Sequence, residues 1–117
     1  MRNDKENLIV NLSLEFALEI IDYSEILEEK RKFVVSNQLL KSGTSIGANV
    51  NEAQNAESKA DFIHKIKIAA KEADETKYWL QLCRLSKNYP DPSGMDEKLN
   101  SIIHVLSKII SSSKNNQ

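Results

Sequence analysis

The sequence predicts an all-α protein, folded as an antiparallel up-down-up-down four-helix bundle. Three observations support this: apolar residues recur every three or four positions in four segments, only short breaks separate the segments, and no stretch alternates with the period of a strand. Short connections oblige consecutive helices to run antiparallel. A chain of 117 residues is one domain by length, so we expect residues 1–117 to form a single bundle.

The first helix is predicted over about residues 5–28, and the second over about residues 33–56. The buried row of the first is Ile9, Leu12, Phe16, Ile20, Tyr23 and Leu27, which recur at three and four residues. The core row of the second is Val35, Leu39, Ile46, Val50 and Ala53. A charged cluster at residues 28–32 separates the two helices.

The third helix is predicted over about residues 59–88, with Ser58 as N-cap and Asp61 three residues later as a weak capping box. The segment Tyr89-Pro90-Asp91-Pro92-Ser93-Gly94 is the clearest break, because two prolines and a glycine destabilise a helix. A fourth helix follows over about residues 95–112, and residues 113–117 are predicted to be a frayed tail.

Composition excludes several classes of protein. No apolar run reaches the roughly 20 residues of a membrane span, and the N-terminus opens onto no signal-peptide core, so we expect a cytoplasmic protein without a membrane partner. Cys83 is the only cysteine, which excludes an intrachain disulfide and a cysteine-rich zinc site. At helical spacing from Leu80, it is expected to be a small core residue.

Charge is distributed unevenly, although the net charge is −1. Residues 1–30 hold eight acids and three bases, whereas residues 31–71 hold seven bases and three acids. Two interpretations remain open: complementary faces that meet within the bundle or between subunits, or a local basic surface for an acidic partner.

A row of polar side chains borders the core of each central helix. The rows are Gln38, Lys41, Ser45, Asn49 and Glu52 in the second helix, and Glu72, Glu75 and Trp79 in the third. A polar group stranded at a core margin costs about 1–3 kcal/mol, so these groups are expected to form a network between helices or an oligomer interface. Trp79 is the preferred interface anchor.

Gly43 and Gly47 are spaced one turn apart on the flank of the second helix opposite its polar row. Glycine within a helix is about 1 kcal/mol less favourable than alanine, which favours close approach of another helix at this pair. Simple tolerance of two glycines in a stable bundle is the alternative.

We expect no catalytic, cofactor-binding or metal-binding residues. Glu72 and Glu75 have the spacing of metal-binding carboxylates, but di-iron bundles use Glu-x-x-His on two helices, and the nearest approximation here is Asp61-x-x-His64. Ser45 has no histidine on the same stretch to act as a base.

Two segments resemble the signatures of a family. The pattern Q-x-x-K-S-x-x-S-I-x-x-N-V-x-E-A, from Gln38 to Ala53, resembles the first signature of the bacterial four-helix-bundle proteins encoded by intervening sequences of large-subunit ribosomal RNA genes, sometimes labelled ribosomal proteins. The stretch at residues 69–80, Ala-Ala-Lys-Glu-Ala-Asp-Glu-Thr-Lys-Tyr-Trp-Leu, resembles the second signature.

The resemblance implies a homo-oligomer, with a ring-like homopentamer as the form associated with this family. A related protein, the accessory variability determinant of diversity-generating retroelements, is similar in fold and acts as a basic pentameric adaptor for nucleic acid and a reverse transcriptase. This chain departs from that relative because it is slightly acidic. Lys41 also stands where the family commonly has arginine. A lysine cannot donate the two parallel hydrogen bonds by which an arginine guanidinium binds a carboxylate or phosphate.

The function expected from these observations is a non-enzymatic homo-oligomeric interaction scaffold. The alternative is an adaptor for structured RNA or DNA, whose candidate phosphate contacts are Arg31, Lys32, Lys59, Lys67 and Lys71. These residues are equally compatible with an ordinary solvated surface.

Overall fold

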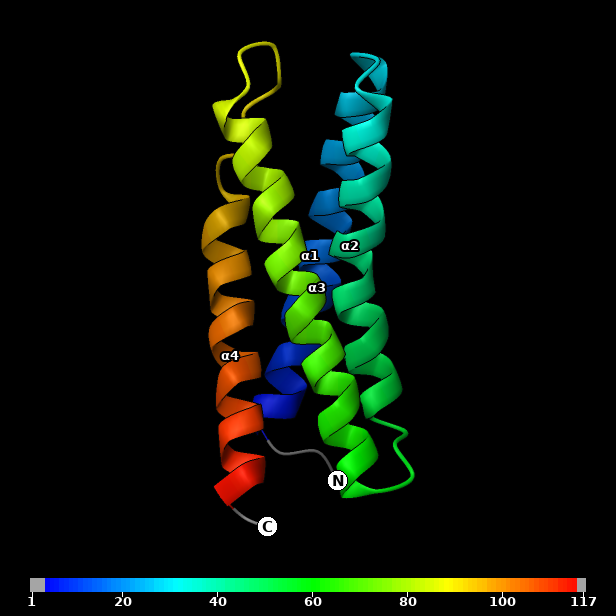
Figure 1. Ribbon diagram of the computed structural model, residues 1–117, viewed down its shortest axis with the longest axis vertical. Helices are drawn as coiled ribbons and strands as arrows, with labels where there is room; N and C mark the ends of the chain where they lie inside the picture. The colour runs from blue at the N-terminus through cyan, green and yellow to red at the C-terminus, as the bar shows by residue number, and fades with distance from the viewer. Residues whose placement is uncertain (1–3, 116–117) are drawn as a thin grey trace.

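Four helices make up almost all of the computed structural model, which describes residues 4–115. They are α1 (Asp4–Glu29), α2 (Phe33–Ala53), α3 (Lys59–Leu85) and α4 (Met95–Asn115), and no strand occurs in this part of the chain. The helices lie alongside one another in a rod of 48 × 20 × 18 Å (Figure 1). The α1–α2 and α3–α4 connections lie at one end of the rod, and the α2–α3 connection lies at the other.

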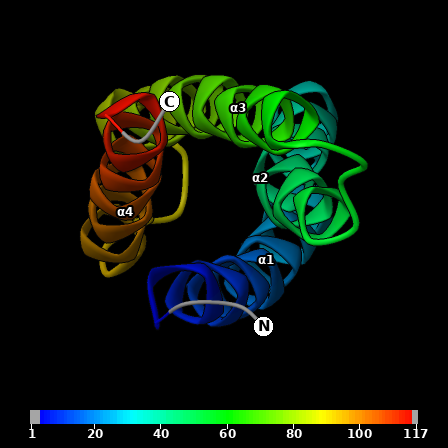
Figure 2. The same cartoon turned by 90° about the horizontal axis from the view of Figure 1, so that it is seen from below.

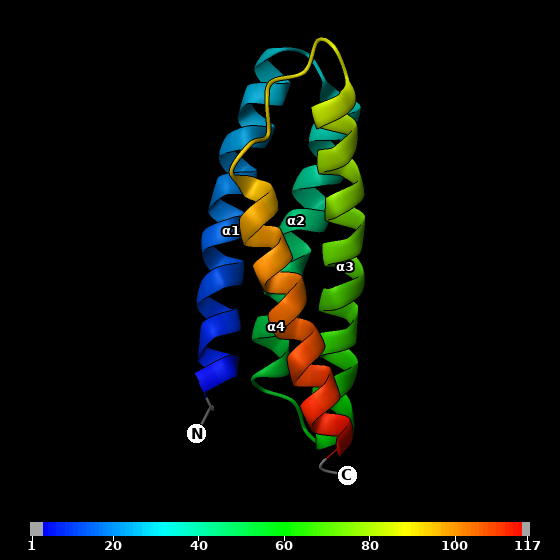
Figure 3. The same ribbon diagram turned by 90° about the vertical axis from the view of Figure 1, so that its left-hand side faces the viewer.

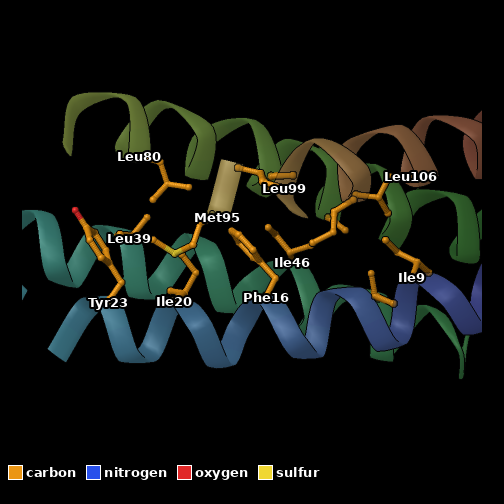
Figure 4. Close-up of a cluster of buried hydrophobic side chains, with 14 of the residues drawn as sticks. Ile9, Phe16, Ile20, Tyr23, Leu39, Ile46, Leu80, Met95, Leu99 and Leu106 are labelled. Carbon is orange, nitrogen blue, oxygen red and sulfur yellow. The ribbon is translucent and has the colours of Figure 1, made fainter. Parts of the chain in front are cut away.

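Each helix packs against its neighbours in the chain, and α4 also packs against α1 (Figures 2 and 3). The apolar rows of all four helices therefore face a common interior. Figure 4 shows this core, in which Phe16, Ile46 and Leu106 are completely buried. Cys83 is buried among these side chains, as its spacing predicts. Leu12 and Val35, which stand in the predicted buried rows, are by contrast only partly buried at the core margin.

Two helices end three residues earlier than predicted. α2 stops at Ala53 because the amides of residues 54–56 bond to the carbonyls three residues before them, which tightens the last turn and ends the α-helical ladder. α3 stops at Leu85 because Ser86 is extended, and the chain then approaches Pro90, which cannot continue a helix. α4 is longer than predicted and continues through Asn115. The rest of the predicted tail, residues 116–117, lies outside the described residues.

Local hydrogen bonds explain where α1 ends and α3 begins. Ser58 caps α3 as predicted: its hydroxyl accepts a bond from the Asp61 amide at 3.0 Å, while the Asp61 carboxylate accepts one from the Glu57 amide. At the end of α1, Arg31 has a φ of 65°, and the Lys32 amide bonds to the Leu27 carbonyl at 2.8 Å. This bond is the six-to-one contact of a Schellman turn, with arginine in the position that glycine usually occupies.

The α3–α4 connection is fastened to α1 by Tyr23. Its hydroxyl donates a 2.6 Å hydrogen bond to the Pro90 carbonyl, which lies 67 residues away in sequence. Burial raises the pKa of Tyr23 and also the pKa of the neighbouring Cys83 thiol. At the same end of the rod, the Lys32 ammonium lies 5.1 Å from the centre of the Tyr89 ring. These contacts hold the loop between the two prolines against the bundle.

Candidate interaction surfaces

Small residues allow α1 and α2 to approach closely. A Cβ placed on Gly43 would lie 2.8 Å from Cγ1 and Cγ2 of Ile20 in α1. At Gly47 the same atom would lie 3.4 Å from the Ser13 backbone oxygen, an ordinary van der Waals distance. The helix beside the glycine pair is therefore α1, and the approach is closest at Gly43.

The polar row of α2 bonds mainly within its own helix. The Ser45 hydroxyl donates to the Lys41 carbonyl at 2.6 Å, and the Asn49 amide donates to the Ser45 carbonyl at 2.8 Å. Ser45 and Asn49 are half-buried, whereas Gln38 and Lys41 are exposed, and neither of these two side chains forms a hydrogen bond or ion pair with residues 7–114, whose side chains the structure describes. Within one copy of the chain, most side chains of this row thus form no hydrogen bond to another helix.

Glu52 is the member of this row that connects two helices. Its carboxylate forms a 3.0 Å ion pair with Lys65 of α3. The hydrogen bond to Glu52, and then the charge of Glu52, raise the pKa of Lys65. Because the pair lies at the surface, with 57% of the Glu52 side chain and 29% of the Lys65 side chain exposed, it contributes little to stability.

The polar row of α3 carries two aromatic side chains at its end. Trp79 is half-buried against the core, and its indole nitrogen donates to the Glu75 carboxylate at 3.1 Å. Tyr78 meets Trp79 edge-to-face at 5.6 Å between ring centroids but is 55% exposed. Tyr78 is consequently the more available of the two rings, although sequence reasoning favoured Trp79.

A buried hydroxyl pair joins the two central helices beneath these rows. Ser42 of α2 and Thr76 of α3 are hydrogen-bonded at 3.0 Å and are both essentially inaccessible to solvent. Thr76 also bonds to the Glu72 carbonyl at 2.8 Å. This pair fixes the register of α2 against α3.

The basic candidate residues do not form one cluster. Arg31 and Lys32 lie at the α1–α2 end of the rod, where Lys32 is engaged with Tyr89. Lys59 begins α3 at the opposite end. Lys67 and Lys71, one turn apart on α3, are exposed and form no ion pair with residues 7–114. These two lysines are the pair best placed to meet an anionic partner.

An exposed apolar surface on α1 and α2 was missed in the sequence. Leu14, Leu18 and Ile21 of α1 are 58%, 57% and 37% exposed, and Leu40 of α2 is 38% exposed. We call these four residues the outer seam. Its signal was present: apolar residues at positions 10, 14, 17 and 21 form a second row beside the core row of the same helix.

A shallow depression of about 190 Å³ lies beside the outer seam. It is lined by residues of both helices, among them the small residues Ala17, Gly47 and Ala48 and the larger apolar residues Val10 and Leu14. Such a shape accepts bulky apolar side chains from another surface.

Among the described residues, no three His, Cys, Asp or Glu side chains are grouped so as to hold a metal ion. None of the helices in this part of the chain is long and apolar enough to cross a membrane. The remaining candidate surfaces are the outer seam, whose apolar side chains are exposed, and the parts of the polar rows whose side chains have no partner in the described chain.

Comparison with models of protein families identifies the family of the chain. Residues 5–112 match the model of the 23S rRNA-intervening sequence protein family. The chain belongs to this family. The match extends over all four helices, and the two segments that resemble signatures of the family lie on α2 and α3, which the Ser42–Thr76 hydrogen bond joins.

A solved structure is similar to this family member over nearly its whole length. It is a protein of unknown function from the S23 ribosomal protein family of Bacteroides thetaiotaomicron, with 43% sequence identity and a TM-score of 0.85. The similarity covers 92% of this chain and 98% of that one. No curated protein sequence matches the chain.

Proposed function

We propose that this protein is a non-enzymatic, cytoplasmic bundle of up-down-up-down topology that assembles with copies of itself into a ring-like homo-oligomer and acts as an interaction scaffold. The observation that carries the proposal is the outer seam. Leu14 and Leu18, one turn apart, are each more than half exposed on a helix whose opposite face is fully buried. Contiguous exposed apolar residues of this kind are typical of protein–protein contact sites.

The polar rows support the same proposal. Three side chains of these rows have no hydrogen bond or ion pair within the described chain: Gln38 and Lys41 of α2 and the Glu72 carboxylate of α3. They lie within about one turn of Ser42 and Thr76, whose hydrogen bond joins the two helices. Side chains of this type supply the polar rim of an interface, where they set register and orientation. The resemblance to ring-forming relatives suggests five copies.

Light scattering after size-exclusion chromatography tests the assembly. We expect the purified protein at micromolar concentration to have a mass that is a multiple of the 13.3 kDa chain, and a pentamer to give five times that mass. A mass of one chain would overturn the proposal. The same measurement with added structured RNA separates a scaffold, whose mass is unchanged, from an adaptor, whose complex is heavier.

A second candidate function is an adaptor for structured RNA or DNA. Lys67 and Lys71 favour it, because both are exposed without an ion-pair partner in the described chain. Binding should then weaken steeply with salt, since each neutralised phosphate adds roughly one unit to the slope of log affinity against log salt. A gel-shift assay with structured RNA at low salt decides this: unchanged mobility at any protein concentration excludes the adaptor.

A further inference from the structure

We infer that the outer seam of one copy is covered by α3 of the next copy, through a stripe consisting of Lys71, Tyr78 and Leu85. This inference rests on the proposed homo-oligomer and names its contact surfaces. The stripe is exposed along its length: Tyr78 is 55% exposed, Leu85 is 72% exposed and Lys71 is exposed. A seven-residue spacing places the three side chains on one face of α3.

The outer seam has the same spacing on α1. Leu14 and Ile21 are also seven residues apart, with Leu18 between them, and Glu28 continues this row seven residues beyond the seam. The two rows therefore have the same spacing. The α3 stripe carries the exposed side chains of Tyr78 and Leu85, and the outer seam borders a depression lined by Ala17 and Gly47. A protruding ring and a small-residue depression are complementary in shape.

The two stripes also lie at the same height in the rod. Gly43 lies against Ile20, so these residues mark one level of α2 and α1. Ser42 bonds to Thr76, so α3 passes the same level near residue 76. Tyr78 is two residues beyond Thr76 and Ile21 is one residue beyond Ile20, and each residue advances a helix by roughly 1.5 Å, so both lie within about one turn of that level.

Opposite charges lie at one shared end of the two stripes. Glu25, Glu28 and Glu29 surround Phe33 at the end of α1, and their carboxylates form no ion pair within the described part of the chain. Just after Leu85, at the corresponding end of α3, Lys87 is exposed and also lacks an ion-pair partner among these residues. The unpaired acids at this end of α1 thus match the unpaired Lys87 after α3.

The symmetry of the contact follows from where the two surfaces lie. Seen along the rod, α1 with α2 forms one side of the bundle and α3 forms another (Figure 2). Different surfaces of successive copies therefore meet, which is a heterologous contact. Rotation about an axis parallel to the helices keeps every residue at its height, so Tyr78 of one copy reaches the outer seam of the next, and the contact repeats until the ring closes.

Two variants and a matched control test the contact. Leu18→Glu alters the outer seam, and Tyr78→Glu alters the α3 stripe; each should change the assembly into single chains that keep the helical circular dichroism of the parent protein. The control is Leu8→Glu, on the same helix and 47% exposed, which faces α4 in the depression shared with His104 and should leave the assembly unchanged.

Mixing the two variants gives the decisive result. Each variant keeps one intact surface, so an equimolar mixture should form a one-to-one dimer of twice 13.3 kDa that cannot grow further. If the parent protein is assembled but the mixture stays monomeric, or Leu18→Glu stays assembled, or Leu8→Glu dissociates it equally, this inference is overturned while the proposed scaffold stands. A monomeric parent protein overturns the proposed function itself.

Cross-linking supplies a measurement that introduces no charge. A chain with both Ile21→Cys and Tyr78→Cys should form disulfide-linked ladders on mild oxidation, because the two positions meet between copies. A chain with Leu8→Cys and Tyr78→Cys should not. Absence of ladders from the first chain, with the parent protein assembled, contradicts the contact.

Discussion

Ile20 of α1 fills the space directly beside Gly43 of α2, so that two of its side-chain carbons would lie 2.8 Å from any Cβ at position 43. Ile20 is completely buried and branched at Cβ, so it cannot turn away. The distance between the two helices at this level is thus set by the absence of a side chain on α2.

Gly43→Ala should therefore lower the free energy of unfolding. Overpacking a core costs about 1–3 kcal/mol, and the gain in helix propensity offsets about 1 kcal/mol of it, so we expect a net loss of up to about 2 kcal/mol. Urea denaturation at a fixed protein concentration measures it. Gly47→Ala is the control, with a loss of less than about 0.5 kcal/mol or a gain.

A second substitution identifies the cause. Ile20→Ala should be less damaging in the Gly43→Ala background than alone, because the new methyl group occupies part of the space that isoleucine leaves. Strictly additive effects of the two substitutions, or a Gly43→Ala protein as stable as Gly47→Ala, would show that the close approach does not limit stability.

The buried hydroxyl pair should behave as a unit. Thr76→Val removes one partner of the 3.0 Å bond to Ser42 and should lower the free energy of unfolding by about 1–3 kcal/mol. The double variant Ser42→Ala/Thr76→Val should lose less than the sum of the two single changes, because no unpartnered hydroxyl remains. Chemical denaturation of the four proteins gives the coupling, and additivity would contradict it.

Tyr23→Phe should loosen the connection between α3 and α4. It deletes the hydrogen bond to the Pro90 carbonyl and should lower the free energy of unfolding by about 1 kcal/mol. Limited proteolysis should also cut residues 86–94 faster than in the parent protein. Tyr89→Phe, which keeps the ring that Lys32 covers, should change neither quantity; equal cleavage of all three proteins would argue against the tether.

The ion pair between Lys98 and Glu19 should give a small alkaline dependence of stability. The 2.7 Å bond to Glu19 raises the pKa of Lys98 above 10.5 in the folded protein. Its stabilisation is present below the unfolded pKa and is lost as pH rises through the folded pKa. The effect should stay below about 1 kcal/mol, because these side chains are 30% and 39% exposed.

Thermal unfolding between about pH 9 and pH 11.5 measures this effect. The midpoint of the parent protein should fall more across that range than the midpoint of Lys98→Met. Lys108→Met, at an exposed position of the same helix, should follow the parent protein. Identical slopes for all three proteins would show that the pair contributes nothing.

Much of the fold was predictable because the signals are local. The buried row of α1, the Ser58 cap and the break at Pro90 each depend on residues within one or two turns of one another. The ends of α2 and α3 were predicted three residues too late. The position of the last helical turn depends on which hydrogen bonds form there, and many different sequences can form them.

The candidate surfaces were predictable only in part. The sequence identified the polar rows, yet it could not show that Ser45 and Asn49 bond back to their own helix while Glu52 crosses to Lys65. Trp79 was chosen as the interface anchor for its large ring, because the size of a side chain can be read from the sequence whereas its exposure cannot; Tyr78 was not considered. Which side chain of a row is satisfied depends on the neighbouring helix.

The sequence by itself determined that four helices form and that α1 carries apolar residues on two of its faces, because a 3.6-residue period is written into the order of the residues. Only the tertiary structure decided that the second apolar row of α1 stays exposed. One helix can be covered only where another helix packs against it; α2 and α4 cover the row of Phe16 and Ile20, and the row of Leu14 and Leu18 remains exposed.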